Sequence, residues 1–135
     1  MIAAGLPRRA VLGGFLALAV SRTSTAAADG ILPAIRRAKT ADAAFLRSGS
    51  ISVRVLASGA SLPAGWMAYR ETLRLARYHA RHDLHVLTPA TSREAASLVA
   101  YYSDRAALSG DPAAFTAARR RLRKVFRRPG ACRPP

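Results

Sequence analysis

The spacing of apolar residues predicts four helices beyond the N-terminal segment of the chain. Residues 29–48 have a thin apolar face, and Gly49 ends this first helix. Residues 66–82 place apolar side chains on one side at 3.6-residue spacing, the pattern of an amphipathic helix. Two further amphipathic stretches, residues 91–110 and 111–128, follow directly after one another. Most of the chain is therefore expected to be helical.

Two short stretches between these helices have the pattern of β-strands. Residues 51–57 alternate at period two, with β-branched residues on one face. Residues 84–88, ended by Pro89, are a second candidate strand, and residues 58–65 form a loop with two glycines and a proline. The expected fold class is α+β, a small and mostly helical domain with one or two short strands. An all-α bundle is the alternative, because two short strands alone make a marginal sheet.

Local sequence signals delimit the last two helices. Thr91 and Glu94 fit a capping box, Gly110 ends the first helix, and Asp111-Pro112 starts the second as an N-cap followed by proline at the first position. Helices joined by so short a turn pack antiparallel, so the sequence predicts a C-terminal helical hairpin. The apolar residues expected to meet in it are Leu98, Val99 and Tyr102 from one helix and Phe115, Leu122 and Val125 from the other.

The first 28 residues have the three regions of an export signal. Arg8 and Arg9 supply the charge of a short basic region, residues 10–20 are apolar, and Ala26 and Ala28 satisfy the A-x-A rule for cleavage. The apolar run is too short for a membrane-spanning helix, which needs about 20 residues. We therefore expect a cleaved signal peptide that ends at Ala28, and no transmembrane segment in the mature chain.

This segment resembles the twin-arginine class of bacterial export signals. The resemblance rests on Arg8-Arg9 followed by Ala10-Val11-Leu12, on a glycine-containing apolar region, and on Arg22 before the cleavage site. Pro7 stands where Ser or Thr commonly precedes the arginine pair, and no lysine follows the apolar triplet. The resemblance implies a bacterial protein exported after folding, to the periplasm or outside the cell. A paired arginine is also compatible with the general secretory route.

The charge of the chain is its most pronounced compositional feature. There are 22 Lys and Arg residues against 7 Asp and Glu residues. The expected organisation is a signal at residues 1–28, one small basic domain at residues 29–128 and a flexible tail at residues 129–135. Three basic residues and no acidic ones leave with the signal, so the mature chain keeps a net charge near +12. Only two of the basic residues are lysines, and the codon bias of a GC-rich genome could by itself produce many arginines.

This charge predicts attraction to an anionic envelope surface or an acidic partner protein. Nucleic acid is disfavoured, because few exposed aromatic residues accompany the charge and an exported protein meets little nucleic acid. The candidate anion-binding residues form a cationic segment in the last helix and a stripe on the helix at residues 66–82. The segment comprises Arg119, Arg120, Arg121, Arg123, Lys124, Arg127 and Arg128, and the stripe comprises Arg70, Arg74, Arg77 and Arg81. Structural alternatives are compensation of the helix dipole for the segment and a solvated helix edge for the stripe.

His79, His82 and His85 form the candidate metal site, because exported zinc or copper proteins use such ligands. Histidines near a helix end also interact with the dipole, which is the structural alternative. Cys132 is the single cysteine, so an internal disulfide is excluded. We expect no cofactor and favour a non-enzymatic protein that binds an anionic partner. The alternatives are a small metal-binding protein or enzyme that uses the histidines, and a chain without a specific activity.

Overall fold

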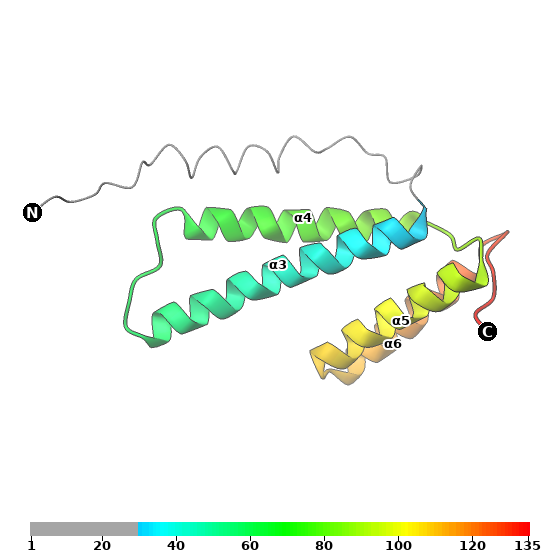
Figure 1. The fold of residues 1–135 in the computed structure, drawn as a ribbon. Coiled ribbons are helices and arrows are strands. Elements are labelled where there is room, and N and C mark those ends of the chain that lie inside the picture. The colour runs from blue at the N-terminus through cyan, green and yellow to red at the C-terminus, as the bar shows by residue number, and fades with distance from the viewer. Residues whose placement is uncertain (1–29) are drawn as a thin grey trace, which may run out of the picture.

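The computed structural model describes residues 30–135, which form four α-helices (Figure 1). Helix α3 spans Ile31–Ala57, α4 spans Trp66–Val86, α5 spans Ser92–Ser109 and α6 spans Pro112–Phe126. Helices α3 and α4 lie side by side as one antiparallel hairpin, and α5 and α6 form a second hairpin beside it. The α3–α4 hairpin is the longer of the two, and its loop end extends past the α5–α6 hairpin (Figure 1).

The expectation of an α+β fold is wrong, and the structure has the all-α architecture given as its alternative. Residues 51–57, predicted as a strand, continue α3, so Gly49 does not end that helix. Residues 84–86, predicted to begin a second strand, form the last turn of α4. Over residues 30–135 no strand is present. The period-two pattern of residues 51–57 is present in the sequence, but the described part of the chain offers no strand with which it could pair.

Helix α3 continues past Gly49 because small residues lie on the side that faces α4. Ser48 and Ser52 are one turn apart and both are buried. Ser48 Oγ accepts a hydrogen bond from Arg70 Nε at 3.2 Å, and Ser52 Oγ accepts one from Trp66 Nε1 at 2.7 Å. A Cβ atom on Gly49 would lie 3.4 Å from the Arg70 guanidinium. Only a helix brings positions 48, 49 and 52 to one face, so these contacts override the local strand propensity.

The main hydrophobic core lies where the two hairpins meet. Its buried members come from all four helices and are Ile31, Ala34, Ile35, Ala38, Leu84, Leu98, Tyr101, Tyr102 and Val125. Leu122 packs against this cluster, so Leu98, Tyr102, Leu122 and Val125 contribute to the core as expected. The expectation for Phe115 is wrong, because its side chain is 46% exposed. Phe115 lies in the first turns of α6, ahead of Ala118, where the contribution of α6 to the core begins.

The predicted C-terminal helical hairpin is confirmed, together with the signals that delimit its helices. Thr91 Oγ1 accepts a hydrogen bond from the Glu94 amide, and Glu94 Oε2 accepts one from the Thr91 amide, both at 3.2 Å. Gly110 ends α5 with φ of 64°, the left-handed conformation that favours glycine. At the start of α6, Asp111 Oδ1 accepts a hydrogen bond from the Ala113 amide at 2.9 Å. These ends form through contacts within one helical turn.

The predicted export signal, residues 1–28, lies outside the described residues. Among the helices of residues 30–135, none combines the length and the apolar character needed to cross a bilayer. Residues 129–135, predicted as a tail, return toward the connection between α4 and α5. There the Cys132 amide donates a hydrogen bond to the Pro89 carbonyl at 3.1 Å, and the Cys132 thiol donates to the Ala90 carbonyl at 3.0 Å.

Candidate anion-binding site on the last helix

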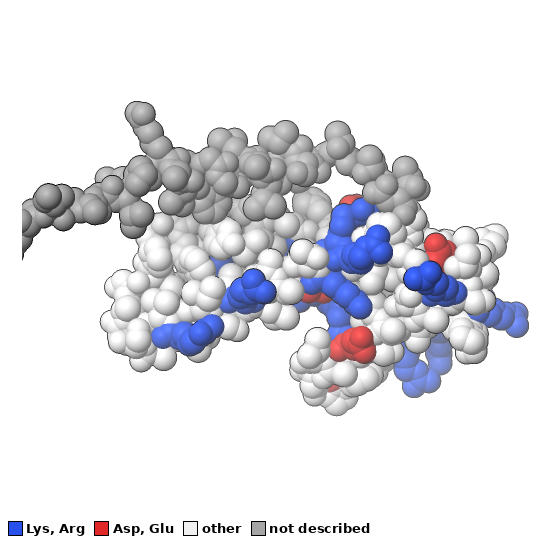
Figure 2. Space-filling view, viewed as in Figure 1, with Lys and Arg blue, Asp and Glu red and all other residues white. Residues whose placement is uncertain are grey.

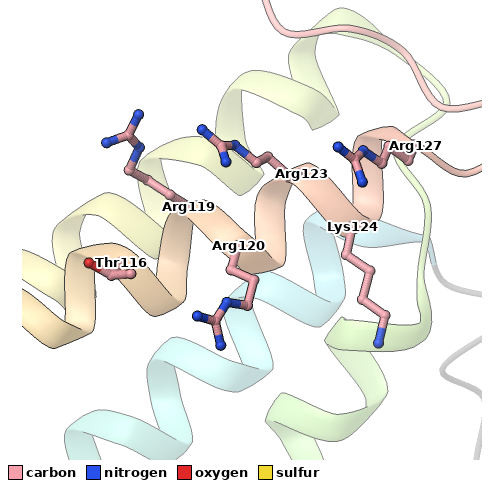
Figure 3. Close-up of a pocket in the computed structure, with 6 residues that line it drawn as sticks. All are labelled: Thr116, Arg119, Arg120, Arg123, Lys124 and Arg127. Atoms are coloured by element: carbon pink, nitrogen blue, oxygen red, sulfur yellow. The ribbon is translucent and has the colours of Figure 1, made fainter.

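Five of the seven predicted cations of α6 share one exposed face of the helix. Together with Thr116 they line a shallow hollow of about 510 Å³, and we call them the outer face of α6: Arg119, Arg120, Arg123, Lys124 and Arg127. Figure 3 shows Arg119, Arg123 and Arg127 projecting to one side of the helix and Arg120 and Lys124 to the other. At about 100° per residue these positions span roughly 140° of the helix circumference. An anion above the hollow can therefore be approached by two rows of charged groups.

Among residues 30–135, no group neutralises the outer face of α6. Helix α6 contains no acidic residue, and within residues 30–135 none of the five side chains has an ion-pair partner. Their position suits the helix, since Arg123 and Lys124 lie in its last turn, where the dipole favours cations. The dipole favours cations only in the last turn of the helix, so it does not account for Arg119 and Arg120, which lie further from the helix end. The remaining like charges repel each other unless an external anion or salt screens them.

The other two predicted cations of α6 have structural contacts instead. Arg128 donates hydrogen bonds to the carbonyl oxygens at the end of α4, to His85 at 3.1 Å, to Val86 at 3.1 Å and to Leu87 at 3.3 Å. These carbonyls have no partner within the helix, so the Arg128 guanidinium caps the C-terminus of α4. Arg121 points toward α4 and α5, where Nη1 lies 2.8 Å from His85 Nδ1 and also contacts His85 Nε2.

The four arginines of the predicted stripe on α4 form ion pairs or ring contacts with other residues of the fold. Arg70 and Arg77 lie over the Phe45 ring at 5.2 and 4.9 Å from its centroid, and Arg74 forms an ion pair with Glu71 at 2.6 Å. Arg77 and Arg81 form ion pairs with a residue of α3, described below. Each arginine of the stripe already contacts a carboxylate or an aromatic ring within the fold. Anion binding by the stripe stays a prediction. Figure 2 shows that basic side chains are spread along the visible face, with one group near the middle of the molecule and others toward both ends.

Asp42 is the central polar residue of the structure, and sequence reasoning missed it. Its side chain is 13% exposed, and Oδ1 accepts hydrogen bonds from Arg77 Nε at 2.7 Å and Arg81 Nη2 at 2.5 Å. Oδ2 accepts one from Tyr101 Oη at 3.1 Å and lies 3.3 Å from Arg105 Nε. The group links α3, α4 and α5. The sequence contained a signal that could have identified this residue: Asp42 is the single acidic residue of α3, and it lies one helical turn from Ala38 and from Phe45 on the apolar side of the helix.

The structure does not bring the three histidines together as a metal site. The His79 and His82 rings both pack on Tyr78, at centroid distances of 5.6 and 6.3 Å, whereas the His85 ring stacks on Tyr102 at 5.8 Å. Among the described residues, no three His, Cys, Asp or Glu side chains are placed to share a metal ion.

Burial, and after it the nearby guanidinium groups of Arg121, Arg105 and Arg81, together lower the pKa of His85 to about 4. His85 is therefore neutral near pH 7. A neutral imidazole can accept the hydrogen bond that Arg121 donates, which is the contact observed.

Comparisons with protein-family models, with curated proteins and with solved structures found no match to this chain.

Proposed function

We propose that this protein is exported and binds an anionic envelope surface or an acidic partner protein through the outer face of α6. The observation that carries the proposal is a group of five exposed cations with no ion-pair partner among residues 30–135. The remaining arginines of the sequence-predicted sites have partners in the fold. The outer face therefore gathers five cations that are available to neutralise an external anion on one side of one helix.

The binding acts through charge and without insertion into lipid. The apolar side of α6 is used by the core, where Val125 is 2% exposed and Leu122 packs against the buried cluster. Each basic residue near an acidic membrane contributes about 1 kcal/mol, so five contribute about 5 kcal/mol, which is several thousandfold in affinity. Such binding weakens steeply as salt shortens the screening length.

The test measures binding of the full chain to vesicles of phosphatidylglycerol and phosphatidylcholine, with pure phosphatidylcholine vesicles as the neutral reference. In the test variant the five residues of the outer face are replaced by glutamine. A matched control replaces five exposed cations elsewhere in the fold: Arg36, Arg47, Arg54, Arg93 and Arg133. Both variants lose the same charge, and circular dichroism establishes that both keep their helices.

The outer-face variant is expected to lose most of its binding to acidic vesicles, by about a hundredfold or more, and the control variant to lose far less. Equal losses in the two variants would show that net charge, and not this face, determines binding. Undiminished binding by the outer-face variant would refute the proposal outright.

Export is the second part of the proposal, and it is supported by the sequence of residues 1–28. The basic pair Arg8-Arg9, the apolar run and the Ala26-x-Ala28 motif are the features of a cleavable signal. The exported fraction of a bacterium producing the full chain is expected to contain a polypeptide that begins at Asp29, as N-terminal sequencing would show. Replacing Ala26 and Ala28 by leucine should prevent this cleavage. Recovery of the uncleaved chain from the cytosol alone would contradict export.

A further inference from the structure

A second cationic hollow lies on the inner side of α6, where α6 meets α4 and α5. It has a volume of about 490 Å³, which is within the range of small-molecule sites. Its charged and aromatic walls come from three helices and include Arg81, His82, His85, Tyr102, Arg105 and Arg121, and we call it the inter-hairpin cleft. None of the five cations of the outer face lines it.

The inter-hairpin cleft has more positive charge than the fold neutralises. Among the described residues, Asp42 is the carboxylate paired with two of the arginines that line the cleft, Arg81 and Arg105, and it is also paired with Arg77 outside the cleft. Arg121 adds a third guanidinium to the cleft, and its polar partner is the imidazole of His85. Three guanidinium groups that line one cleft, two of them sharing a single carboxylate, are stabilised by an additional anion.

Two residues that line the cleft each have a buried polar atom without a hydrogen-bond partner within residues 30–135. The atoms are Tyr102 Oη and Arg81 Nε, and Tyr102 as a whole is 4% exposed. Burial raises the pKa of Tyr102 to about 12, so its hydroxyl stays protonated and available as a donor. Buried polar groups in folded proteins are almost always paired, and two orphaned atoms on residues that line one cleft point to an acceptor that is supplied from outside the chain.

The remaining walls of the cleft are aromatic and apolar. The Tyr78 and His82 rings are stacked with an interplanar angle of 16°, and the His85 and Tyr102 rings with one of 27°. Alanines of α6, among them Ala117 and Ala118, also line the cleft. Such walls suit a flat apolar group and would offer nothing to a free inorganic ion.

We propose that the inter-hairpin cleft binds a small aromatic phosphate monoester. The phosphate accepts hydrogen bonds from the guanidinium groups of Arg105 and Arg121, whose planar geometry matches phosphate oxygens, and from the Tyr102 hydroxyl. The aromatic ring of the ligand packs against the rings of Tyr78 and His82. As a dianion, phosphate offsets more of the excess charge than a carboxylate does. This site is separate from the outer face of α6, and either can exist without the other.

The test is calorimetric titration of the full chain with phenyl phosphate, with inorganic phosphate and phenol as reference compounds. Phenyl phosphate is expected to bind at least tenfold more tightly than inorganic phosphate, and phenol to show no measurable binding, because the cleft recognises both charge and ring. Arg121→Gln is expected to weaken phenyl phosphate binding about tenfold or more, as loss of a charge-assisted hydrogen bond does. Arg93→Gln removes an equal charge from an exposed position of α5 and should leave the affinity within about twofold.

Tyr102→Phe is the second variant, and it separates a ligand contact from a structural role. It removes a hydroxyl with no partner among the described residues, so the melting temperature of the ligand-free protein should not fall, while phenyl phosphate affinity should drop about fivefold or more. Equal affinities for phenyl phosphate and inorganic phosphate, or equal losses in Arg121→Gln and Arg93→Gln, would overturn the proposal. Absence of any phenyl phosphate binding, or undiminished binding in Tyr102→Phe, would overturn it too.

Discussion

Replacement of Asp42 by asparagine tests whether one carboxylate holds the two hairpins together. The substitution keeps the shape of the side chain but removes its charge and replaces one acceptor oxygen with an amide donor. Three guanidinium groups, those of Arg77, Arg81 and Arg105, then lose their common counterion. We expect the free energy of unfolding to fall substantially, because α3, α4 and α5 meet at this point.

The exposure of the charged groups sets the size of this effect. Breaking a fully buried ion pair costs about 3–5 kcal/mol, whereas an exposed pair contributes about 0–1 kcal/mol. Here the carboxylate is 13% exposed and the three arginine side chains are 21%, 24% and 28% exposed, which is closer to the buried case. We therefore expect a loss of about 3 kcal/mol, equivalent to a fall of roughly 10–15 °C in Tm for a domain of this size.

Urea unfolding followed by circular dichroism measures the loss, and an unchanged m-value would show that the folded state stays equally compact. The matched control is Asp104→Asn, which makes the same charge change at an exposed position of α5 with no partner among the described residues. The control should stay within about 0.5 kcal/mol of the parent chain. If Asp42→Asn is no more destabilising than Asp104→Asn, the network contributes no net stability and our reasoning about it is wrong.

Two further predictions concern His85 and Ser52. The pKa of His85 is about 4 in the fold against an ordinary 6.5, so the unfolded chain takes up the proton first as the pH falls. Stability should thus be constant above pH 6.5 and decline between pH 6.5 and 4, by about 1–2 kcal/mol after allowance for solvent screening. The decline should vanish in His85→Gln but persist in His79→Gln, and a decline that survives in His85→Gln would contradict this assignment. Ser52→Ala leaves the indole N–H of Trp66 without its acceptor, so the free energy of unfolding should fall by about 1–2 kcal/mol and the fluorescence of this single tryptophan should change. Ser50→Ala, at an exposed position, should change neither the stability nor the fluorescence. Similar effects in the two variants would exclude the proposed role of Ser52.

The parts of the fold that could be predicted are those set by short-range contacts. The capping box of Thr91 and Glu94, the left-handed Gly110 and the Asp111 cap act within one turn of the chain, so their geometry follows from residue types and spacing alone. The antiparallel arrangement of α5 and α6 follows from the short turn between them. The amphipathic pattern of α6 likewise placed Val125 on the buried side.

The strand predicted at residues 51–57 failed for a reason that lies outside that stretch. Alternation of β-branched residues favours a strand only where another strand can pair with it. Ser52 instead lies opposite Trp66, and Ser48 opposite Arg70, across the helix–helix contact. The partner that decides the conformation is more than a dozen residues away, so no local window contains it.

The sequence by itself determined the ends of the last two helices, the C-terminal hairpin and a strongly cationic last helix. Only the tertiary structure decided which cations are free: Arg121 and Arg128 contact α4, whereas the outer face of α6 meets no described residue that could neutralise it. It also decided that Asp42 pairs with three arginines and that the hydroxyl of Tyr102, a residue lining a cationic cleft, has no partner in the described part of the chain. The physical reason is that charge pairing and burial depend on what lies opposite in space, whereas helix caps depend on neighbours in the chain.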